Sequence, residues 1–498
     1  MKISYIGHAA LLVETGALKI VTDPWLKGPA YCSQWYVFPK PVDIKPVLDA
    51  DYILYSHGHE DHTHPASAML LDKKAKVFFP YSWYDGAVGF FGSMGFKSVT
   101  EAVNEKTYRL NDDTHVTYFA NNLDNVIVIE HGSEVLVDVN DALHSAPQTL
   151  IEAIAKKITT RWKKIDYMFS SYGGASYFPN CIKFKDKDDV EIAKTRELFF
   201  LNNFCKIVSL LKPKYAVPHA SDFVLLNDNQ RWMNETKVPR QKIAEYYKTY
   251  VSGYADTEIV AMYPGDFIEN GKPNLVSPYK AKLKEDGLLH LVDEEYKDEI
   301  TEKRKHLKIM DEQADEVFEK LKQHVNNKLY IIPEEKRKEI KYAVQLTDYN
   351  NSVFYTIDLK GTSPKVYKSG ELEKDCELVI KVKSEALLFS LVHEWGGDAI
   401  IIGYGCEVDI FDIKTIEQGL DTLCIRLLTN YPNTKEYLKR VPFRAMKYLM
   451  TDSIKRKSLV SAVKFADPKL TDNMLWLSKT KCQICNACNL PEQLPLLS

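Results

Sequence analysis

Residues 56–64 constrain the fold of this chain more than any other feature of its sequence. They read SHGHEDHTH and hold four of the 13 histidines of the chain, directly after an apolar segment. On a loop that leaves a strand, the spacing H-x-H-x-D-H can turn imidazole and carboxylate groups toward one centre, and both are ligands of zinc, iron and manganese. The alternative is a solvated polar loop. We therefore predict a metal site with His57 and His59 at one ion and Asp61 and His62 at a second, and with His64 beside the ligands or facing substrate.

Apolar segments with strand periodicity flank this loop on both sides. Residues 1–14 and 17–25 predict two strands joined at Thr15-Gly16, and residues 51–56 predict a short strand that ends at the histidines. Strands with helices between and after them predict an α/β layered core. Further strands are predicted over 76–80, 115–120, 125–130, 134–139 and 215–219, and helices over 65–72 and 186–211.

The composition excludes several classes of protein. Hydrophobic residues make up 45% of the 498 residues and charged residues 27%, which is typical of a globular chain rather than a disordered or collagen-like one. A net charge of -3 gives no electrostatic basis for binding nucleic acid or an anionic membrane. No apolar run reaches about 18 residues, so we expect no transmembrane helix. Six of the nine cysteines are scattered, which fits reduced thiols and a cytoplasmic location.

The pattern changes near residue 276, where we place a domain boundary. Residues 276–334 are dense in alternating charge with sparse apolar residues at helical spacing, which predicts an exposed or bridging helical linker. Residues 335–450 return to strands, followed by a helix and by another strand-like segment over 399–410, and predict a smaller α+β domain. Residues 451–498 form a separate tail. The first domain then spans residues 1–275 and carries the predicted metal site.

The histidine run and its surroundings resemble the metallo-β-lactamase superfamily. The segments GHAALL at 7–12 and TDPW at 22–25 resemble the opening hairpin of its broad hydrolase branch. The resemblance implies an αββα sandwich for the first domain. It also implies three more residues near the metals: Asp23 as a support or merely a turn-capping aspartate, Asp141 as the bridging ligand with Asp138 as its competitor, and His219 as the last ligand.

One ligand that the resemblance implies is missing. The superfamily usually places a third histidine for the first ion after the strand that here covers residues 115–120. This chain has Asn121 and Asn122 at that place. The first site is then weak, uses Asn122, or is empty, which leaves both a dinuclear and a mononuclear centre open.

Residues 1 to about 240 are more specifically similar to the catalytic portion of CMP-N-acetylneuraminate hydroxylases. The segments DPWLKGPA at 23–30, YGGASYFP at 172–179 and IAKTR at 192–196 carry this likeness. It implies a non-haem iron centre and a nucleotide-sugar-like or other polar substrate. Residues 335–430 resemble a sterol-carrier-protein-like module, which can offer an apolar groove or a dimer surface. That hydroxylase family typically carries an N-terminal Rieske domain, which this sequence lacks, so we expect electrons from a separate donor protein.

The glycine-rich loop and the helix after it supply the candidate substrate-binding residues. Gly174 allows a close backbone approach and Ser176 can donate a hydrogen bond, although a tight structural turn explains the loop equally well. Lys194 and Arg196 could contact an anionic substrate. A solvated helix face is the alternative for these two residues.

The tail contains a cysteine motif of its own. Cys482, Cys485 and Cys488 have the spacing C-x2-C-x2-C, which occurs in thiolate metal sites and iron–sulfur clusters, but no fourth cysteine follows. The motif therefore predicts a zinc or cluster site, a redox thiol relay, or no chemistry.

Three functions follow from these residues. The first is an iron-dependent oxygenase, in which His57, His59, Asp61, His62, Asp141 and His219 hold one or two irons. The second is a hydrolase, in which the same ligands hold zinc or manganese and Asp61 or Asp141 orients an attacking water toward an ester, amide or phosphodiester. The third is a non-catalytic metal-binding protein. A small-molecule substrate and a homodimer are the remaining expectations.

Overall fold

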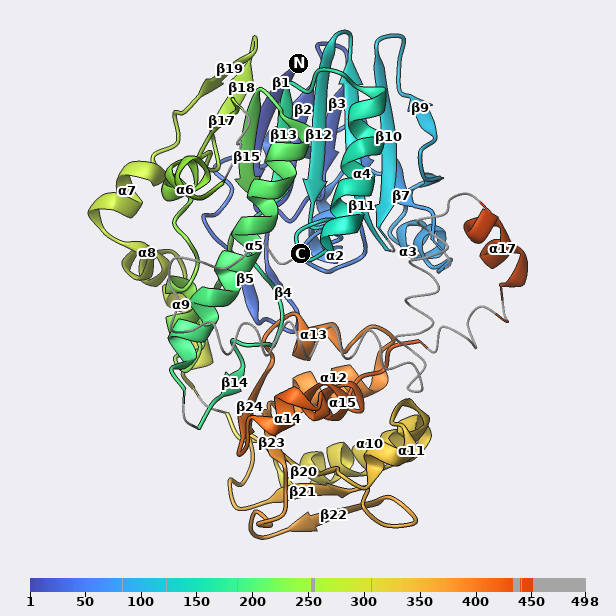
Figure 1. Cartoon of the computed structure of the whole chain (residues 1–498), viewed down its shortest axis with the longest axis vertical. Helices are drawn as coiled ribbons and strands as arrows, with labels where there is room; N and C mark the ends of the chain where they lie inside the picture. The colour runs from blue at the N-terminus through green and yellow to red at the C-terminus, as the bar shows by residue number, and fades with distance from the viewer. Residues whose placement is uncertain are drawn as a thin grey trace.

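Two β-sheets packed face to face form the centre of the N-terminal part of the molecule (Figure 1). The computed structural model describes residues 1–450 except positions 83, 122, 186, 252–255, 306, 433–438 and 440. The first sheet has the order β19-β18-β1-β2-β3-β6-β7-β8. Its strands are β1 (Lys2–Gly7), β2 (Ala10–Glu14), β3 (Lys19–Thr22), β6 (Tyr52–Leu54), β7 (Lys76–Pro80), β8 (Ser98–Ala102), β18 (Phe267–Glu269) and β19 (Lys272–Asn274).

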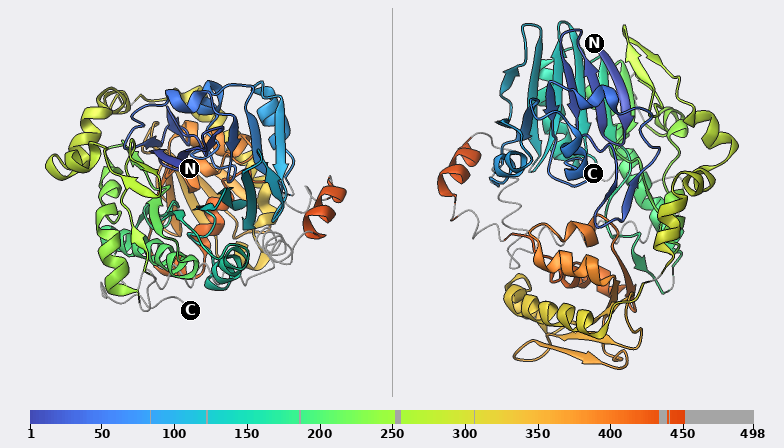
Figure 2. Two further views of the ribbon diagram at one scale, coloured as in Figure 1. Left: turned by 90° about the horizontal axis from the view of Figure 1, so that it is seen from above. Right: turned by 180° about the vertical axis from the view of Figure 1, so that it is seen from behind.

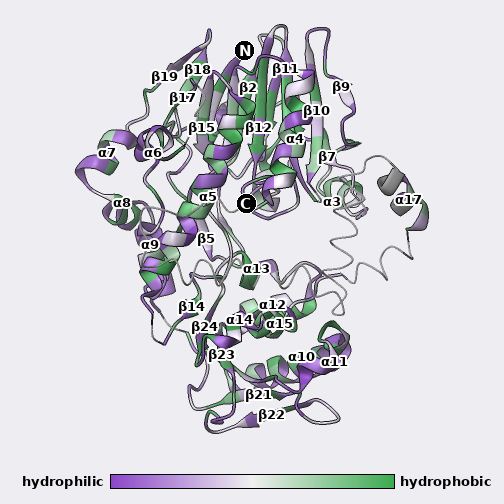
Figure 3. Cartoon of the chain, in the orientation of Figure 1, coloured by the Kyte–Doolittle hydropathy of each residue, from purple (hydrophilic) through white to green (hydrophobic). Residues whose placement is uncertain are grey.

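The second sheet has the order β17-β15-β13-β12-β11-β10-β9. Its central strand β12 is apolar on both faces, because one face meets the first sheet and the other meets helices. Figure 3 shows this hydrophobic stripe along the strand. The strands are β9 (Thr107–Arg109), β10 (Thr114–Asn121), β11 (Asp124–His131), β12 (Glu134–Asn140), β13 (Tyr167–Ser171), β15 (Tyr215–His219) and β17 (Glu258–Ile259).

Helices cover the outer face of each sheet and complete an αββα sandwich. The helices α1 (Lys45–Leu48), α2 (Pro65–Leu70) and α3 (Ala87–Ser93) lie on the side of the first sheet. The helices α4 (Gln148–Arg161), α5 (Asp189–Leu211) and α6 (Ile243–Tyr250) pack on the second sheet. Asp188 caps α5 by accepting hydrogen bonds from the first backbone N–H groups of the helix. The layered α/β core is therefore confirmed.

A small sheet and a row of helices connect the sandwich to the C-terminal part. The sheet has the order β16-β5-β4, with β4 (Pro29–Ala30), β5 (Trp35–Val37) and β16 (Phe223–Leu225). The predicted linker divides between two cores: α8 packs against β5 and β16, whereas α10 packs against α12. The elements are η1 (Arg231–Glu235), η2 (Arg240–Lys242), α7 (Tyr279–Glu285), α8 (Leu288–Glu295), α9 (Lys297–Lys303), α10 (Asp311–Lys328), η3 (Leu329–Ile331) and α11 (Glu334–Arg337).

The C-terminal domain is a second, smaller sheet covered by helices. It lies below the sandwich in Figure 1 and in the right-hand view of Figure 2. The sheet has the order β14-β24-β23-β20-β21-β22. The elements are β14 (Ile182–Lys183), β20 (Lys341–Leu346), β21 (Phe354–Asp358), β22 (Lys365–Ser369), β23 (Leu378–Val382), β24 (Cys406–Ile410), α12 (Ser384–Val392), α13 (Asp398–Ile401), α14 (Lys414–Glu417) and α15 (Leu420–Arg426). Helix α17 (Pro442–Met450) lies instead beside the sandwich, where its Arg444 pairs with Glu101 of β8 (Figure 1). None of the described helices is long and apolar enough to cross a membrane.

The two domains interlock through strand β14, which comes from the N-terminal half of the chain and pairs with β24 in the C-terminal sheet. Just before β14, the backbone N–H of Tyr177 donates to the Ile401 carbonyl at 2.6 Å, and its hydroxyl donates to Asp421 Oδ2 at 2.8 Å. Tyr177 and Phe178 are buried in the same core as α10 and α12. The domains therefore share one hydrophobic core.

Two local expectations differ from the structure. Residues 1–14 form two strands rather than one, because the chain turns at His8, whose φ of 50° is left-handed. Residues 399–410 form helix α13 and strand β24 rather than one strand-like segment. In both cases apolar residues continue through a turn. Hydrophobic periodicity alone therefore does not show where one element ends and the next begins.

We predict that Tyr177→Phe lowers the free energy of unfolding by about 1–3 kcal/mol, because it leaves the buried Asp421 carboxylate without this donor. Tyr118→Phe is the matched control. The Tyr118 hydroxyl is buried and makes no hydrogen bond among the described residues, so its loss is expected to be neutral or stabilising. Guanidinium unfolding of the full chain measures both variants, and equal effects would contradict the prediction.

Candidate metal centre

The histidine loop runs from the end of β6 to the start of α2 and is mostly buried. His57, Asp61 and His62 are each at most 3% exposed. Strand β6 lies between β3 and β7 and is parallel to both, so the loop leaves the sheet at its carboxyl edge. Loops from β12 and β15 of the second sheet, which carry Asp141 and His219, end at the same place. The sandwich therefore brings the residues of the predicted site together from both sheets.

The first group of ligands is completed by a residue that the sequence analysis missed. His57 Nε2 lies 2.8 Å from His59 Nδ1. Asp124, the first residue of β11, offers a carboxylate oxygen so placed that the three ligand atoms all lie within 4.8 Å of one another. Asn122, the predicted substitute for the missing histidine, lies outside the described residues. The signal for Asp124 was a carboxylate just beyond the place where the histidine was expected.

The second group centres on His62. Its Nε2 lies 3.3 Å from Asp61 Oδ2 and 3.4 Å from Asp141 Oδ2. His219 Nε2 lies 3.1 Å from Asp138 Oδ1. Asp141 and Asp138 were the two candidates for the bridging ligand. Asp141 lies beside His62, and Asp138 lies beside His219.

The Asp23 carboxylate supports this centre through hydrogen bonds. Its carboxylate accepts hydrogen bonds from the Ser56 backbone N–H at 2.8 Å, from the Ser56 hydroxyl at 2.5 Å and from the Asn140 amide. It also lies 3.0 Å from His62 Nδ1. A carboxylate on one imidazole nitrogen fixes the tautomer and turns the other nitrogen toward a metal. Asp23 therefore contacts a ligand rather than capping a turn.

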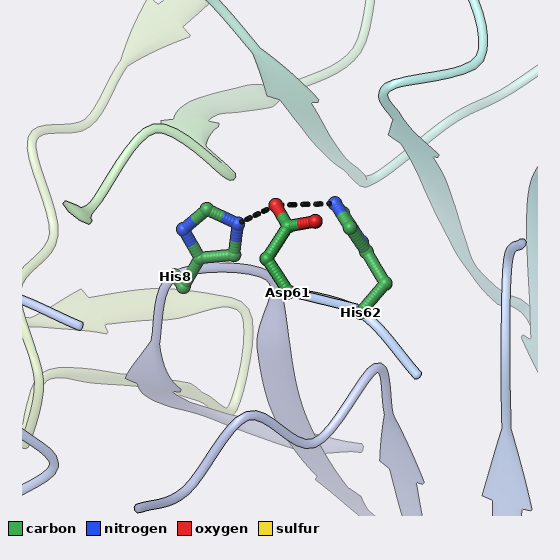
Figure 4. A group of neighbouring side chains, drawn as sticks. All are labelled: His8, Asp61 and His62. Carbon is green, nitrogen blue, oxygen red and sulfur yellow. Dashed lines mark hydrogen bonds and ion pairs between the residues drawn. The ribbon is translucent and has the colours of Figure 1, made fainter. Parts of the chain in front are cut away.

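Asp61 is held on both oxygens, by His8 and by Tyr31, neither of which the sequence analysis placed at the site. His8 Nε2 lies 2.8 Å from Asp61 Oδ2, and the Tyr31 hydroxyl donates to Asp61 Oδ1 at 2.5 Å. Figure 4 shows Asp61 between His8 and His62. The Asp61 carboxylate thus has little freedom to turn.

The backbone at the centre is strained at several loops. Four residues beside or among the ligands have left-handed φ angles although none is glycine. Such conformations cost of order 1–3 kcal/mol each and cluster at functional sites. The four residues and their φ angles are His8 at 50°, Asp23 at 37°, Asn140 at 53° and Ala220 at 52°.

The donor set fits a metal ion. His62 Nε2, Asp141 Oδ1 and both ring nitrogens of His219 are buried and make no hydrogen bond among the described residues. Buried polar atoms without partners are costly and rare, so several of them in one cluster point to a ligand that satisfies them. Imidazole nitrogens and carboxylate oxygens together suit zinc, iron or manganese.

The charges of the cluster also favour a cation. Burial lowers the pKa of His62, but Asp61 and Asp141 outweigh burial and raise that pKa well above its ordinary value of 6.5. Burial and then the neighbouring Asp23 raise the pKa of Asp138. Burial raises the pKa of Asp141, but the imidazoles of His62, His144 and His57 together outweigh burial and lower that pKa. Of the two competing carboxylates, Asp141 is therefore the one that stays anionic and attracts a cation.

The remaining predicted residues lie outside the metal cluster or make structural contacts within the protein. Both nitrogens of His64 are engaged, with Ser67 and with the Pro29 carbonyl, so His64 caps α2. A side chain on Gly174 would overlap the Phe200 ring, with a Cβ contact of 1.9 Å. The Ser176 hydroxyl accepts a 3.3 Å hydrogen bond from Phe178 N, as in a turn. The motif Cys482, Cys485 and Cys488 lies outside the described residues.

Lys194 and Arg196 differ sharply although both lie on α5. Lys194 is exposed and pairs with Glu191 on its own helix. Arg196 lies against the rings of Phe199 and Phe200, and its buried Nε has no hydrogen-bond partner among the described residues. Phe200 also stacks on His144, whose Nδ1 contacts the Asp141 carbonyl. Two stacked rings, Phe200 and His144, thus separate Arg196 from Asp141.

Comparison with known families identifies the first domain. Residues 2–170 match a model described as a beta-lactamase superfamily domain. Residues 2–170 are a metallo-β-lactamase superfamily domain. The match and the buried His/Asp cluster together support the predicted metallo-β-lactamase fold with a candidate metal site in this domain.

Curated relatives of the superfamily domain are similar over about half of this chain. Cytidine monophosphate-N-acetylneuraminic acid hydroxylase of Danio rerio is 23% identical over 254 residues, which cover 47% of this chain and 40% of the relative. The hydroxylase of Mus musculus is 25% identical over 256 residues, covering 47% and 41%. The chain thus spans less than half the length of these relatives.

Solved structures with this fold are more distant. CmlA, a diiron beta-hydroxylase from Streptomyces venezuelae, is 17% identical with a TM-score of 0.35 and covers 52% of each chain. Igni18, a metallo hydrolase from Ignicoccus hospitalis, is 15% identical with a TM-score of 0.36, covering 54% of this chain and 97% of its own.

We predict that the affinity for a metal ion at His62 rises with pH. Metal and proton compete for Nε2, and the pKa of His62 is raised well above 6.5. Below that raised pKa, the apparent dissociation constant should fall about tenfold per pH unit as the proton leaves. Titration of the metal-free chain with zinc at several pH values from below to above 6.5 measures this, and a flat profile would contradict it.

Proposed function

We propose that this protein is a non-haem iron oxygenase of the hydroxylase type. The observation that carries the proposal is the group His57, His59 and Asp124, in which a carboxylate just beyond the expected place of a third histidine completes the set. Two histidines and one carboxylate with open positions form the ligand set typical of non-haem Fe(II) oxygenases. Similarity to enzymes named as hydroxylases supports the same reaction class.

The second ion would be held by His62, Asp61, Asp141 and His219. Asp23 and His8 keep His62 and Asp61 turned toward it. Iron bound in these two groups would supply the activation of O₂. The residues of the chain would hold the ligands in place. The anionic Asp61 and Asp141 would neutralise part of the positive charge of the metal ions.

The substrate in this proposal is a polar metabolite with an anionic group, such as a nucleotide-sugar-like molecule. Arg196 supports this class, because the buried Nε of its guanidinium has no hydrogen-bond partner among the described residues and a ligand can supply one. A carboxylate or phosphate can accept two parallel hydrogen bonds from such a group. Phe200 lies between Arg196 and His144, so the anion would sit to one side of the reacting centre.

Hydroxylation needs electrons as well as O₂. Insertion of one oxygen atom into a C–H bond reduces the other atom to water and consumes two electrons and two protons. We propose that an electron-donor protein supplies them, either directly or through Cys482, Cys485 and Cys488 as a cluster or thiol relay. A cytoplasmic location and the absence of nucleic-acid and membrane partners remain part of this proposal.

Hydrolysis is the second candidate function. The group His62, Asp141 and His219 would equally hold zinc or manganese, and Asp61 or Asp141 would then orient a water for attack on an ester, amide or phosphodiester. A non-catalytic metal-binding role is less supported than either, because Asp124 completes the first group of ligands. For the C-terminal domain, a sterol-carrier-protein-like fold and a dimer surface stay proposals.

We expect the iron-loaded full chain to consume O₂ when it receives a reductant and an anionic substrate. Asp124→His should abolish this uptake while keeping a metal, because three histidines are a zinc-type set. Asp113→His makes the same exchange at an exposed residue beyond the other end of β10 and should change neither property. O₂ electrode traces and metal content per chain measure both variants. No uptake in any iron-loaded sample, with hydrolysis by the zinc or manganese form, would favour the second candidate.

Arg196→Ala should raise the KM for an anionic substrate by roughly 10-fold or more with little change in kcat, because it removes binding rather than ligands. Lys194→Ala is the matched control, since Lys194 lies on the same helix but is exposed and paired with Glu191. Steady-state kinetics of both variants decide the point, and equal KM values for the two would contradict a role for Arg196.

A further inference from the structure

The segment 29–37 lies between the metal centre and the C-terminal domain. It contains β4 and β5 of the small sheet. Trp35 stacks on Phe223 of β16 with ring centroids 3.5 Å apart, and Tyr404 of the C-terminal domain packs against Trp35 at 5.8 Å. The Gln230 amide also donates to the Tyr404 carbonyl at 2.5 Å. Contacts with Tyr404 of the C-terminal domain therefore help to hold residues 29–37 in place.

Tyr31 joins this segment to the metal ligands. Its backbone N–H donates to Glu60 Oε2 at 2.6 Å, and its hydroxyl donates to Asp61 Oδ1 at 2.5 Å. The side chain is 1% exposed, and its ring lies 5.0 Å from the Trp35 ring. Tyr31 therefore contacts two consecutive residues of the histidine loop, Glu60 and Asp61.

Gly403 of the C-terminal domain lies directly against Tyr31. A Cβ placed on Gly403 would meet the Tyr31 Cβ at 2.5 Å and the Ala399 carbonyl at 2.8 Å, both closer than real Cβ contacts. The absence of a side chain at 403 therefore allows α13 and the residues after it to approach Tyr31 this closely.

The conformation of Tyr31 also requires support from its surroundings. Tyr31, Cys32 and Ser33 have consecutive left-handed φ angles of 56°, 52° and 60°. Three such residues in a row are unfavourable for L-amino acids and persist only when surrounding contacts impose them. Gly403 on one side and Asp61 with Glu60 on the other supply those contacts.

We propose that the C-terminal domain positions the metal ligand Asp61 through Tyr31, so that Gly403 and Tyr31 are positioning residues for the ion held by Asp61 and His62. The proposal rests on the metal centre described under the proposed function, but not on which reaction it performs. It gives the C-terminal domain a direct part in the metal centre of the metallo-β-lactamase domain. A purely structural contact would stabilise the chain without changing the geometry at the ion.

The test is a double-mutant cycle on the full chain, with Tyr31→Phe, Gly403→Ala and the two combined. Metal-free protein is titrated with Co²⁺, whose visible absorption reports the geometry of its ligands. Tyr31→Phe should weaken the second Co²⁺ by roughly 10- to 100-fold and change its spectrum, the usual effect of losing a group that supports a ligand. The first Co²⁺, at His57, His59 and Asp124, should bind as in the parent chain and serves as an internal control.

Gly403→Ala should also weaken the second Co²⁺, and the combined variant should be no weaker than Tyr31→Phe alone, because both act on one hydrogen bond. Two controls separate this from lost stability. Gly370→Ala adds a methyl to the same domain where nothing lies within 4 Å, and Tyr355→Phe removes a hydroxyl that donates to the Ala314 carbonyl. Both should leave Co²⁺ binding unchanged.

Three results would overturn the proposal. The first is parent-like binding and spectrum of the second Co²⁺ in Tyr31→Phe. The second is a full, additive effect of Gly403→Ala in the Tyr31→Phe background. The third is an equal change in the two control variants. If Gly403→Ala does not fold, Tyr404→Leu takes its place in the cycle, because it removes the contact with Trp35 beside Tyr31. Co²⁺ binding is read without turnover, so a failed oxygenase assay leaves this test intact.

Discussion

The hydrogen bonds to the Asp23 carboxylate are the interaction on which the rest of the centre depends. Asp23 follows β3, Ser56 follows β6 and Asn140 ends β12, so one buried carboxylate ties together loops from both sheets. Its contact with His62 Nδ1 extends the same network to a ligand. Left-handed backbone at Asp23 and Asn140 is tolerated because these contacts are made. Asp23 thus joins imidazoles and carboxylates from both halves of the sandwich in one network.

The buried charges explain why such a centre is compatible with a stable fold. Carboxylates without partners in a protein interior are strongly unfavourable, and paired ones depend on geometry. Here His62 lies among Asp23, Asp61 and Asp141, so a proton or a metal ion can supply the positive charge. The nitrogens of His219 and Asp141 Oδ1, which make no hydrogen bond among the described residues, mark where the proton alone does not satisfy the site. The same cluster thus serves folding and prepares the centre for a cation.

Much of the fold and part of the site could be predicted from the sequence, for identifiable physical reasons. Strands such as β12 and helices such as α5 have periodic apolar residues, and the histidine loop has a metal-ligand spacing within a few residues. Asp124 was missed because the expected ligand type was a histidine, although a carboxylate lies just beyond the expected place. His8 and Tyr31 were missed because their partner Asp61 is 53 and 30 residues away in the chain. Contacts over such distances depend on how the sheets pack.

The sequence by itself determined that this chain builds an α/β core and presents clustered imidazoles and carboxylates at a strand end, because periodicity and short-range spacing are properties of neighbouring residues. Only the tertiary structure decided which carboxylate completes each group of ligands and which residues hold them. It also decided that the C-terminal domain approaches the centre, through β14 in its sheet and Gly403 against Tyr31. These choices rest on long-range packing, in which a single missing Cβ sets how closely two domains meet.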